Sequence, residues 1–232
     1  NIKMIDLKKD VKYVKGVGPN RVQLLNKLGI FTLEDLITYY PRTYEDRSKP
    51  KSLLECIDGE EALIEVIAIS KMIESKFSRK TMQKIMIRDN TSSAEAIWFN
   101  QTYLKSKFTV GKKYRMYGKI EKKYGKIIIA SPVFDEYGST QNTGRIIPIY
   151  PLTYQLSQNT LRKIIENAMN EVYGNLPETL PQYIIKTNRI LGINDAIKTI
   201  HFPQELKDFK IARKRLVFEE LLITQLSLMS LK

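Results

Sequence analysis

Cysteine and histidine are almost absent from this sequence, with one copy of each, Cys56 and His201. A lone cysteine excludes an internal disulfide and any zinc site built from several cysteines. Long apolar runs are missing too, because the longest stretch without a charged residue, 146–161, has 16 residues and is interrupted by two prolines. It is too short and too broken to cross a bilayer. We therefore expect a soluble protein of a reducing, cytoplasmic compartment, without membrane contact.

Signatures of catalysis are equally scarce. Six residues, not four, separate Gly111 from Gly118, so this stretch does not have the spacing of a phosphate-binding loop. The glutamate pairs at 60–61 and 219–220 have no partners that would complete a nuclease metal site. Apolar neighbours favour a packed, structural role for His201. We expect no catalytic residue and no metal ligand in this chain.

Positive charge is what the sequence has in excess. It contains 38 Lys and Arg against 25 Asp and Glu, for a net charge of +13. Residues 71–126 hold 15 basic and four acidic residues, a net charge of +11. Such a concentration favours nucleic acid as the partner over an anionic membrane or an acidic protein. Predicted phosphate contacts are Lys84, Arg88, Lys105, Lys107, Arg115, Lys119, Lys122, Lys123 and Lys126.

The N-terminal part is predicted to be helical. Apolar residues at helical spacing indicate a helix over 21–28 that ends at a glycine. A second helix begins at a capping-box pair, Thr32 and Asp35, and is stopped after Tyr40 by a proline. The polar, turn-rich residues 42–52 are predicted to be a connector.

Two glycines precede the first of these helices. Gly16 and Gly18 resemble the hairpin of a helix-hairpin-helix element, in which backbone N–H groups approach a phosphate beside a helix N-terminus. A turn that caps the helix and packs Val17 inward explains the same residues equally well. Phosphate contact at Gly16 and Gly18 is therefore one of two open interpretations.

From about residue 60 the apolar period changes to two, which indicates strands. Asn100 begins a segment, up to residue 108, that can form a short helix between the third and fourth strand. Five short antiparallel strands with a small helix after the third are typical of the Greek-key barrel called the OB-fold. We therefore predict an α+β protein whose five-stranded barrel has strands at 62–69, 82–89, 95–99, 114–120 and 126–129.

Aromatic residues gather at the end of the third strand. In period two, Phe99 lies on the face opposite Trp98, and Tyr103 follows one helical turn later. Exposed aromatics beside lysines suit stacking on nucleic-acid bases. Aromatics at a strand end also pack inward, so we expect Trp98 in the core and leave Phe99 and Tyr103 open between the two roles.

The C-terminal part is predicted to be an extended segment at 145–151 followed by helices, the first capped by Ser157. Further helices are expected at 181–191, at 194–199 and from 204 to the end. Because the chain begins with Asn and stops inside an apolar run, we expect it to be the N-terminal piece of a longer protein. The predicted organisation is a helical segment (1–52), a barrel (53–144) and a helical linker (145–232).

Several short stretches, in order along nearly the whole chain, resemble the N-terminal region of one protein family. The sharpest is Trp-Phe-Asn-Gln-x-Tyr at 98–103, and the others lie at 15–19, 24–32, 35–36, 40–47, 147–151, 201–203, 212–213, 215–216 and 218–221. Together they resemble the RecG family of bacterial replication-fork helicases, truncated before the motor domains.

The resemblance implies a function for the barrel. In that family an OB-fold wedge sits at a DNA branch, and two wedge aromatics, which match Phe99 and Tyr103, stack on bases where the arms separate. It implies binding of replication forks and Holliday junctions in bacterial DNA repair, recombination and fork reversal. ATP and Mg²⁺ are expected only with the full-length helicase, so this chain should bind forks without unwinding them.

Other functions stay open. The chain could be a freestanding junction-binding subunit similar to RuvA, which would tetramerise, whereas we expect a monomer. It could be a module that binds a protein partner, such as the acidic tail of a single-strand-binding protein. A metal-dependent nuclease is a third alternative, for which the sequence offers no ligand set.

Overall fold

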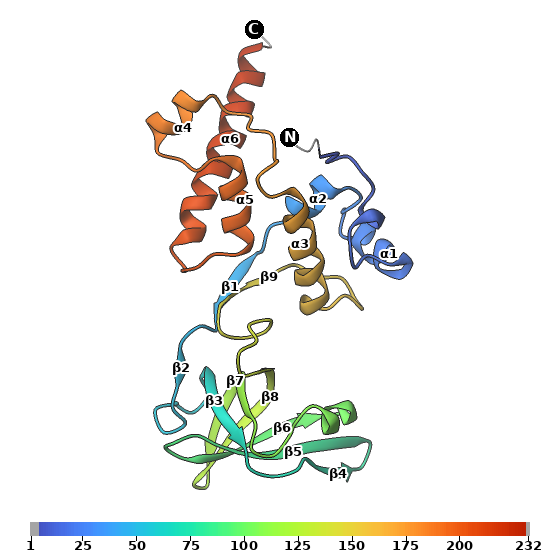
Figure 1. Ribbon diagram of the computed structural model, residues 1–232, viewed down its shortest axis with the longest axis vertical. Coiled ribbons are helices and arrows are strands. Elements are labelled where there is room, and N and C mark those ends of the chain that lie inside the picture. The colour runs from blue at the N-terminus through green and yellow to red at the C-terminus, as the bar shows by residue number, and fades with distance from the viewer. Residues whose placement is uncertain (1–4, 231–232) are drawn as a thin grey trace. The chain divides into compact units, whose positions relative to one another are not determined.

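The computed structural model describes residues 5–230 and consists of two compact units (Figure 1). Residues 46–147 form the barrel unit, and the residues before and after them together form the helical unit. The first and last of the three predicted segments lie largely in the helical unit, and the middle one lies in the barrel unit. The predicted boundaries at 52 and 144 themselves stay a prediction. Within 5–230, no helix combines the length and the apolar character that spanning a membrane requires.

The helical unit contains six α-helices among its described residues. A 3₁₀-helix, η1 (Val11–Tyr13), comes before them, and the short strands β1 (Thr43–Asp46) and β9 (Ile146–Ile149) pair with each other. The helices are α1 (Pro19–Lys27), α2 (Leu33–Ile37), α3 (Gln158–Val172), α4 (Gln182–Asn188), α5 (Ile193–His201) and α6 (Asp208–Ser230).

The predicted helix starts are confirmed by their caps. Thr32 and Asp35 form the complete capping box of α2, and the Ser157 side chain accepts from the Thr160 N–H at the start of α3. Helix α2 ends at Ile37, three residues earlier than predicted. The predicted connector at 42–52 is partly wrong, because β1 and the short strand β2 (Pro50–Lys51) lie within it. Polar residues hid these strands, since neither presents an apolar face.

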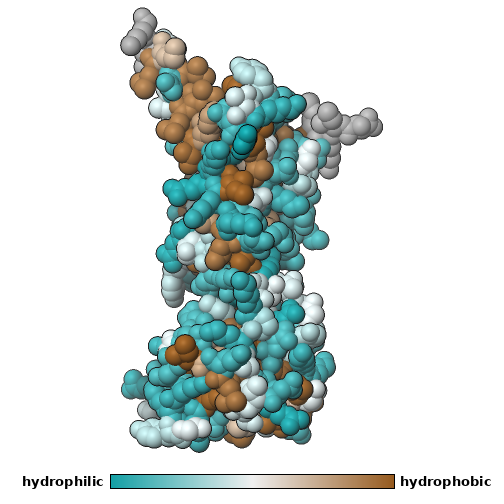
Figure 2. Space-filling view, turned by 90° about the vertical axis from the view of Figure 1, so that its left-hand side faces the viewer, coloured by the Kyte–Doolittle hydropathy of each residue, from teal (hydrophilic) through white to brown (hydrophobic). Residues whose placement is uncertain are grey.

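The helical unit has its own core. Helix α3 supplies its centre, with Leu161, Ile165 and Ala168 fully buried against Leu25 of α1 and Leu36 of α2. The apolar side chains near the C-terminal end of α6 are exposed instead, and Figure 2 shows them as a band of hydrophobic residues. This exposed set comprises Leu221, Ile223, Leu226, Leu228 and Met229.

The barrel unit confirms the OB-fold. Its strands follow the order β2-β3-β7-β8-β6-β5-β4, and a further pairing of β3 with β5 closes five of them into a ring. The 3₁₀-helix η2 (Thr102–Ser106) follows β6, as predicted for the small helix. The strands not yet placed are β3 (Glu61–Ala68), β4 (Ile73–Phe77), β5 (Lys80–Arg88), β6 (Ser93–Phe99), β7 (Lys113–Lys123) and β8 (Lys126–Glu136).

The barrel differs from the prediction in its edges and in strand direction. Strands β2 and β4 were not predicted, and β8 continues to Glu136, seven residues beyond its predicted end. The pairs β2–β3 and β6–β8 are parallel rather than antiparallel. The parallel pair β6–β8 follows from ring closure: η2 carries the chain from the end of β6 to β7, and the β7–β8 hairpin then returns it alongside β6.

Along each strand of the barrel, successive side chains point alternately to the inside and to the outside. On β6, Ala94, Ala96 and Trp98 point inward, and on β5 Ile85 and Ile87 do the same. Trp98 is 1% exposed, and its Nε1–H donates to the Pro132 carbonyl at 2.9 Å. The prediction that Trp98 belongs to the core is confirmed.

A β-bulge bends the β7–β8 hairpin. The register shifts between Tyr117 and Lys119, and the residue between them is Gly118. A Cβ atom on Gly118 would lie 3.0 Å from the Cα of Pro132 and 3.1 Å from the Ala130 carbonyl oxygen. Glycine is required here because two backbones approach too closely for a side chain.

Candidate nucleic-acid interface

Phe99 and Tyr103 flank a tight turn at the end of β6, which we call the aromatic turn (residues 99–103). Phe99 is 51% exposed and Tyr103 is 63% exposed. The alternation of β6 explains why, because Trp98 takes the inward position and leaves Phe99 outside, opposite Met82 of β5. Both aromatics that the sequence left open between core and surface therefore lie on the surface.

The aromatic turn is fixed to β5 by hydrogen bonds. The Asn100 N–H donates to the Thr81 carbonyl at 2.8 Å, and Asn100 Oδ1 accepts from the Thr81 N–H at 2.9 Å. Asn100 has a φ of 55°, a left-handed conformation that asparagine tolerates better than most residues. The next N–H, that of Gln101, donates to the side chain of Gln83 at 3.0 Å.

The β4–β5 hairpin supplies positive charge at the same end of the barrel. Because Met82 faces Phe99, the preceding residues Arg79 and Lys80 lie just past the aromatic turn, and Lys76 faces Thr81 on the other arm. These three side chains are exposed, and within residues 5–230 none has an ion-pair partner. They were not among the predicted site residues, because β4 was not predicted.

The sequence carries only a weak signal for the β4–β5 hairpin. Apolar residues alternate at 73, 75 and 77 only in part, since position 75 is serine, and the Ser-Arg pair at 78–79 is a weak turn signal. Ser78 adopts a φ of 51° at the turn. A glycine or Asn-Gly turn there would have made the hairpin predictable.

A row of cations runs along the outer face of β5. Lys80, Lys84 and Arg88 share this face, since the alternate positions 83, 85 and 87 are buried inside the barrel. Lys84 Nζ lies 3.7 Å from Glu95 Oε1, and Lys126 Nζ lies 3.9 Å from the same oxygen. The structure therefore brings the predicted residues Lys84, Arg88 and Lys126 together on one surface.

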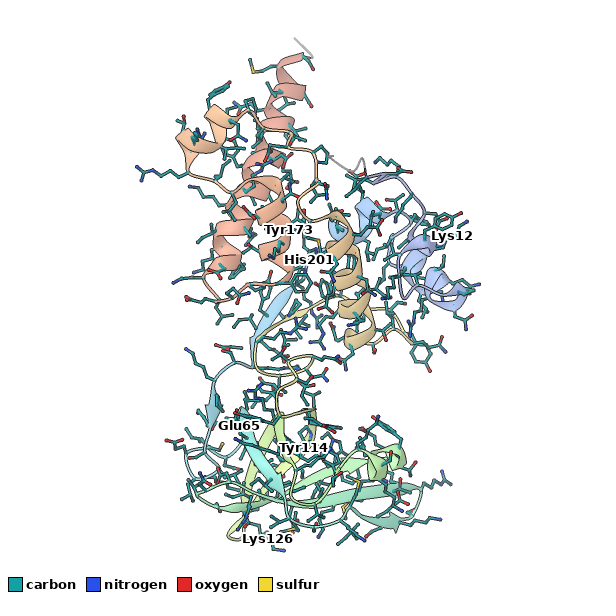
Figure 3. The ribbon with its side chains drawn as sticks, viewed as in Figure 1. Lys12, Glu65, Tyr114, Lys126, Tyr173 and His201 are labelled. Atoms are coloured by element: carbon teal, nitrogen blue, oxygen red, sulfur yellow. The ribbon has the colours of Figure 1, made fainter. Side chains whose placement is uncertain are left out.

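The β7–β8 hairpin lies at the opposite end of β6 from Phe99. Because β6 and β8 are parallel and Glu95 pairs with Ile128, the start of β8 lies beside the start of β6. Figure 3 shows Lys126 near the hairpin tip. Its turn is of type I′, with positive φ at both Tyr124 and Gly125. Predicted site residues Lys122 and Lys123 are therefore at the far end of the barrel from the aromatic turn.

Besides Lys84 and Lys126, which lie near Glu95, three more predicted phosphate contacts have acidic neighbours. Arg115 is only 19% exposed along its side chain, and its Nε donates to Glu65 Oε1 at 3.1 Å. Lys105 Nζ lies 3.7 Å from Glu74, and Lys123 Nζ lies 3.3 Å from Glu121. Lys107 and Lys119 are exposed. This geometry favours a structural role for Arg115, whereas phosphate binding by the others stays a prediction.

The glycine turn before α1 belongs to the helical unit. Gly16 has a φ of 92°, and its carbonyl accepts from Arg21 Nη1 at 2.7 Å. Asn167 of α3 donates to the neighbouring carbonyl of Lys15 at 2.8 Å. Val17 also packs partly into the core. The turn is thus docked on α3, and phosphate contact by Gly16 and Gly18 stays a prediction.

His201 is buried in the helical unit (Figure 3). Its Nε2 lies 2.7 Å from the Ile37 carbonyl, which can only accept, so Nε2 carries the proton and Nδ1 accepts from the Tyr150 hydroxyl at 2.8 Å. Burial lowers the pKa of His201 to about 4, against a smaller opposing effect of the Ile37 carbonyl. The expected packed role of His201 agrees with this environment. Among residues 5–230, no group of three or more His, Cys, Asp or Glu side chains is placed to hold a metal ion.

The helical unit also contains a groove of about 1240 Å³. It is lined by apolar residues of α2, α5 and α6, together with charged residues of both signs such as Arg213 and Glu220. None of the residues predicted to bind DNA lines it. The aromatic turn and the outer face of β5 therefore remain the candidate interface.

The charge of the barrel needs a correction. Residues 46–147 contain 19 basic and 12 acidic residues, a net charge of +7, and the rest of the chain carries +6. Acidic residues outside 71–126, such as Glu61 and Glu65 on β3, reduce the excess. The excess is shared by two hairpins: residues 73–88 (β4–β5) hold five basic residues and one acidic residue, and residues 113–136 (β7–β8) hold six basic and three acidic residues.

An OB-fold barrel with exposed aromatics beside free cations is the architecture of nucleic-acid-binding proteins. Comparison with known families matches residues 10–172 to the RecG wedge domain. The chain belongs to this family.

Individual relatives agree. The chain is 36% identical to the ATP-dependent DNA helicase RecG of Thermotoga maritima, over 98% of this chain and 30% of that protein. It is 30% identical to RecG of Streptococcus pneumoniae, over 98% of this chain and 33% of that protein. A solved structure of RecG bound to a three-way DNA junction superposes with a TM-score of 0.89 at 35% identity, over 98% of this chain and 31% of that one. The chain spans about a third of the length of these relatives.

Proposed function

We propose that this chain is the DNA-branch-binding wedge of a RecG-type helicase. It binds replication forks and Holliday junctions, and the aromatic turn stacks on the bases at the point where strands separate. The proposal is supported by membership of the wedge family and by similarity to a RecG structure solved on a three-way DNA junction. In the cell this activity serves recombination, DNA repair and fork reversal.

The observation that carries the proposal is the contrast between two neighbouring aromatics. Trp98 is buried, whereas Phe99 and Tyr103 are more than half exposed on a turn that hydrogen bonds hold in place. Exposed rings on a fixed backbone lose little freedom when a base stacks on them. A core-filling role for Phe99 and Tyr103 would require burial that they do not have.

The energies are of the right size for strand separation. Stacking on an aromatic side chain contributes about 1–3 kcal/mol of binding free energy per base. Opening a DNA duplex costs about 1.4 kcal/mol of stacking free energy per base-pair step. Two aromatics can therefore offset the opening of about one to four steps. Lys80, Lys84 and Arg88 would bind the phosphates of the strand that leaves the branch, which makes affinity fall steeply with salt.

A fork-binding titration tests this function. Phe99→Ala and Tyr103→Ala are each expected to weaken binding to a fork by about fivefold to a hundredfold, the range given by loss of one stacked base. Binding to linear duplex of the same length should be unchanged, because a duplex offers no unstacked base at this position. Gel-shift titration at two salt concentrations measures both affinities.

The matched control is Tyr124→Ala. Tyr124 is an exposed aromatic, as Phe99 and Tyr103 are, but it lies on the β7–β8 hairpin at the other end of β6. Its removal should leave the preference for forks over duplex intact. Equal losses on fork and duplex from Phe99→Ala, or an equal effect from Tyr124→Ala, would contradict the stacking role.

The remaining expectations concern the full-length protein and its partners. We propose unwinding with ATP and Mg²⁺ for a full-length protein; the names of the relatives call them ATP-dependent DNA helicases. We further propose that the chain is a monomer in the bacterial cytoplasm, which sedimentation of the isolated chain tests for the oligomeric state. Contact with a single-strand-binding protein stays a separate proposal, and fork affinity measured with excess tail peptide tests it.

A further inference from the structure

A glutamine interrupts the apolar inner face of β5. Gln83 is 0% exposed, lies in line with Ile85 and Ile87, and faces Trp98 across the strand pair β5–β6. Burying an amide is unfavourable unless its polar atoms are hydrogen-bonded. A leucine or methionine would fill the same space without that requirement. The partners of Gln83 must therefore explain why it is there.

The hydrogen bonds of Gln83 connect three segments. Its Nε2 donates to Glu74 Oε2 of β4 at 3.0 Å and to Thr81 Oγ1 at 3.1 Å. Its Oε1 accepts from the backbone N–H of Gln101 at 3.0 Å. Both amide hydrogens and one acceptor position are thus used. One buried side chain ties the β4–β5 hairpin to the aromatic turn.

The connection continues from Gln101 to the surface. Gln101 lies midway between Phe99 and Tyr103, and its Oε1 accepts from the Tyr103 hydroxyl at 3.0 Å. Two hydrogen bonds, one to the backbone and one to the side chain of Gln101, therefore link Gln83 in the barrel core to the Tyr103 hydroxyl through Gln101. Glu74, the other partner of Gln83, also lies 3.7 Å from Lys105 Nζ on η2. The arrangement restrains η2 from both ends.

We infer that Gln83 is a positioning residue, which holds the aromatic turn in its base-stacking geometry from inside the barrel. The inference rests on the proposed function of Phe99 and Tyr103. Its physical basis is preorganisation: a turn already fixed before DNA arrives loses less conformational freedom on binding. The alternative is that Gln83 contributes only to the stability of the barrel.

Two substitutions of buried residues separate these roles. Gln83→Met keeps the approximate volume and removes the hydrogen bonds. Ile85→Val is the matched control, because Ile85 points inward from the same strand and has no bond to the aromatic turn. Trp98 is the sole tryptophan and faces Gln83, so its fluorescence reports whether the barrel core is intact in each variant.

The decisive measurement is a double-mutant cycle on fork affinity. Gln83→Met should weaken fork binding by about threefold to tenfold, the loss expected from one hydrogen bond, and leave linear-duplex binding unchanged. In the Phe99→Ala/Tyr103→Ala background it should have no further effect. Ile85→Val should leave fork affinity unchanged. A Gln83→Met loss that persists undiminished without the aromatics overturns the positioning role.

A second readout needs no DNA. Amide hydrogen exchange at Gln101, followed by NMR, should accelerate by about threefold to tenfold in Gln83→Met and stay constant in Ile85→Val. Unchanged protection of Gln101 would overturn the inference. The proposed function fails separately, if the Phe99→Ala/Tyr103→Ala variant binds forks as tightly as the unmodified chain.

Tyr103→Phe keeps the test possible even if Gln83→Met does not fold. It retains the ring and removes only the hydroxyl that binds Gln101, and its site is exposed, so the core is untouched. We expect fork binding about twofold to fivefold weaker with unchanged Trp98 fluorescence. Full fork affinity in Tyr103→Phe would overturn the link through Gln101.

Discussion

Each unit of this protein contains a buried polar centre, and the two centres differ in where their hydrogen bonds end. In the helical unit, His201 bonds to Tyr150 and Ile37, both inside the same core. In the barrel unit, the bonds of Gln83 continue through Gln101 to the exposed Tyr103. Burial alone is therefore a poor guide to the role of a polar residue. The location of its hydrogen-bond partners distinguishes a buried polar residue that stabilises a core from one that orients a surface segment.

The largest expected effect contrasts two adjacent residues of the barrel. Trp98→Ala should lower the free energy of unfolding of the barrel by about 3–5 kcal/mol, because it leaves a cavity and an unpaired Pro132 carbonyl. Phe99→Ala should cost less than about 1 kcal/mol, since its ring is exposed. Urea unfolding followed by NMR signals from each unit measures both. Comparable losses from the two variants would remove the distinction between core and surface aromatics.

Acid should distinguish the two units. His201 is neutral when folded, with its pKa lowered to about 4, whereas an unfolded histidine has a pKa near 6.5. Its contribution to stability is therefore complete above pH 6.5 and is lost as the pH falls toward 4, by about 3 kcal/mol in total. Helicity, followed by circular dichroism, reports the helical unit, and Trp98 fluorescence reports the barrel.

The control for this pH dependence is His201→Gln, whose amide can donate to Ile37 and accept from Tyr150 without titrating. In this variant the stability of the helical unit should not decline between pH 6.5 and 5, a range in which carboxylates contribute little. A decline of equal size in the barrel over that range would show that His201 is not its source.

A smaller effect is expected at the bulge of the β7–β8 hairpin. Gly118→Ala should destabilise the barrel by about 1–3 kcal/mol, because the added Cβ meets the backbone of Pro132 and Ala130. Gly125→Ala on the same hairpin has open space around it and only the strain of its positive φ, so it serves as the comparison. Thermal unfolding followed by Trp98 fluorescence measures both. A greater loss from Gly125→Ala would contradict the close approach.

The smallest expected effect concerns single cations. Lys80→Gln should reduce the slope of log affinity against log salt for forks by about 1, because Lys80 has no acidic partner in residues 5–230. Lys113→Gln should leave the slope unchanged, since Lys113 already pairs with Glu65 at 3.3 Å and lies over the Tyr137 ring. Equal slopes for both variants would show that the β5 face is not the phosphate-binding surface.

Much of the fold followed from periodicity. Strands with an apolar inner face, such as β3 and β6, and helices with side-chain caps, such as α2 and α3, were located to within a few residues. The strands that were missed, β1, β2 and β4, are short or lie at an edge, so that their residues need not alternate. Pairing direction and ring closure depend on contacts far apart in sequence and leave no local signal.

The candidate site was predictable only in part. The sequence pointed to Phe99 and Tyr103 but could not decide their exposure, because the burial of Trp98 depends on which face of β6 meets the core. It grouped cations by sequence position, whereas the structure separates Arg115, paired with Glu65, from Lys80, which has no acidic partner within residues 5–230. Gln83 gave no signal, since a polar residue in an alternating strand is ordinary until its burial is known.

The pairing of β3 with β5, which closes the ring and which we call the seam, affects how the barrel resists force. The ring closes where Ile67 and Ala68 of β3 face Arg88 and Ile87 of β5, and these are the sole pairings between the two strands. By contrast, β5 pairs with β6 at every position from Met82 to Arg88, which covers the whole length of β6. Load applied to the aromatic turn enters β5 at the end away from the seam, where it is shared with β4 and β6. A barrel built in this way can yield at its seam while the part that meets the load keeps its shape.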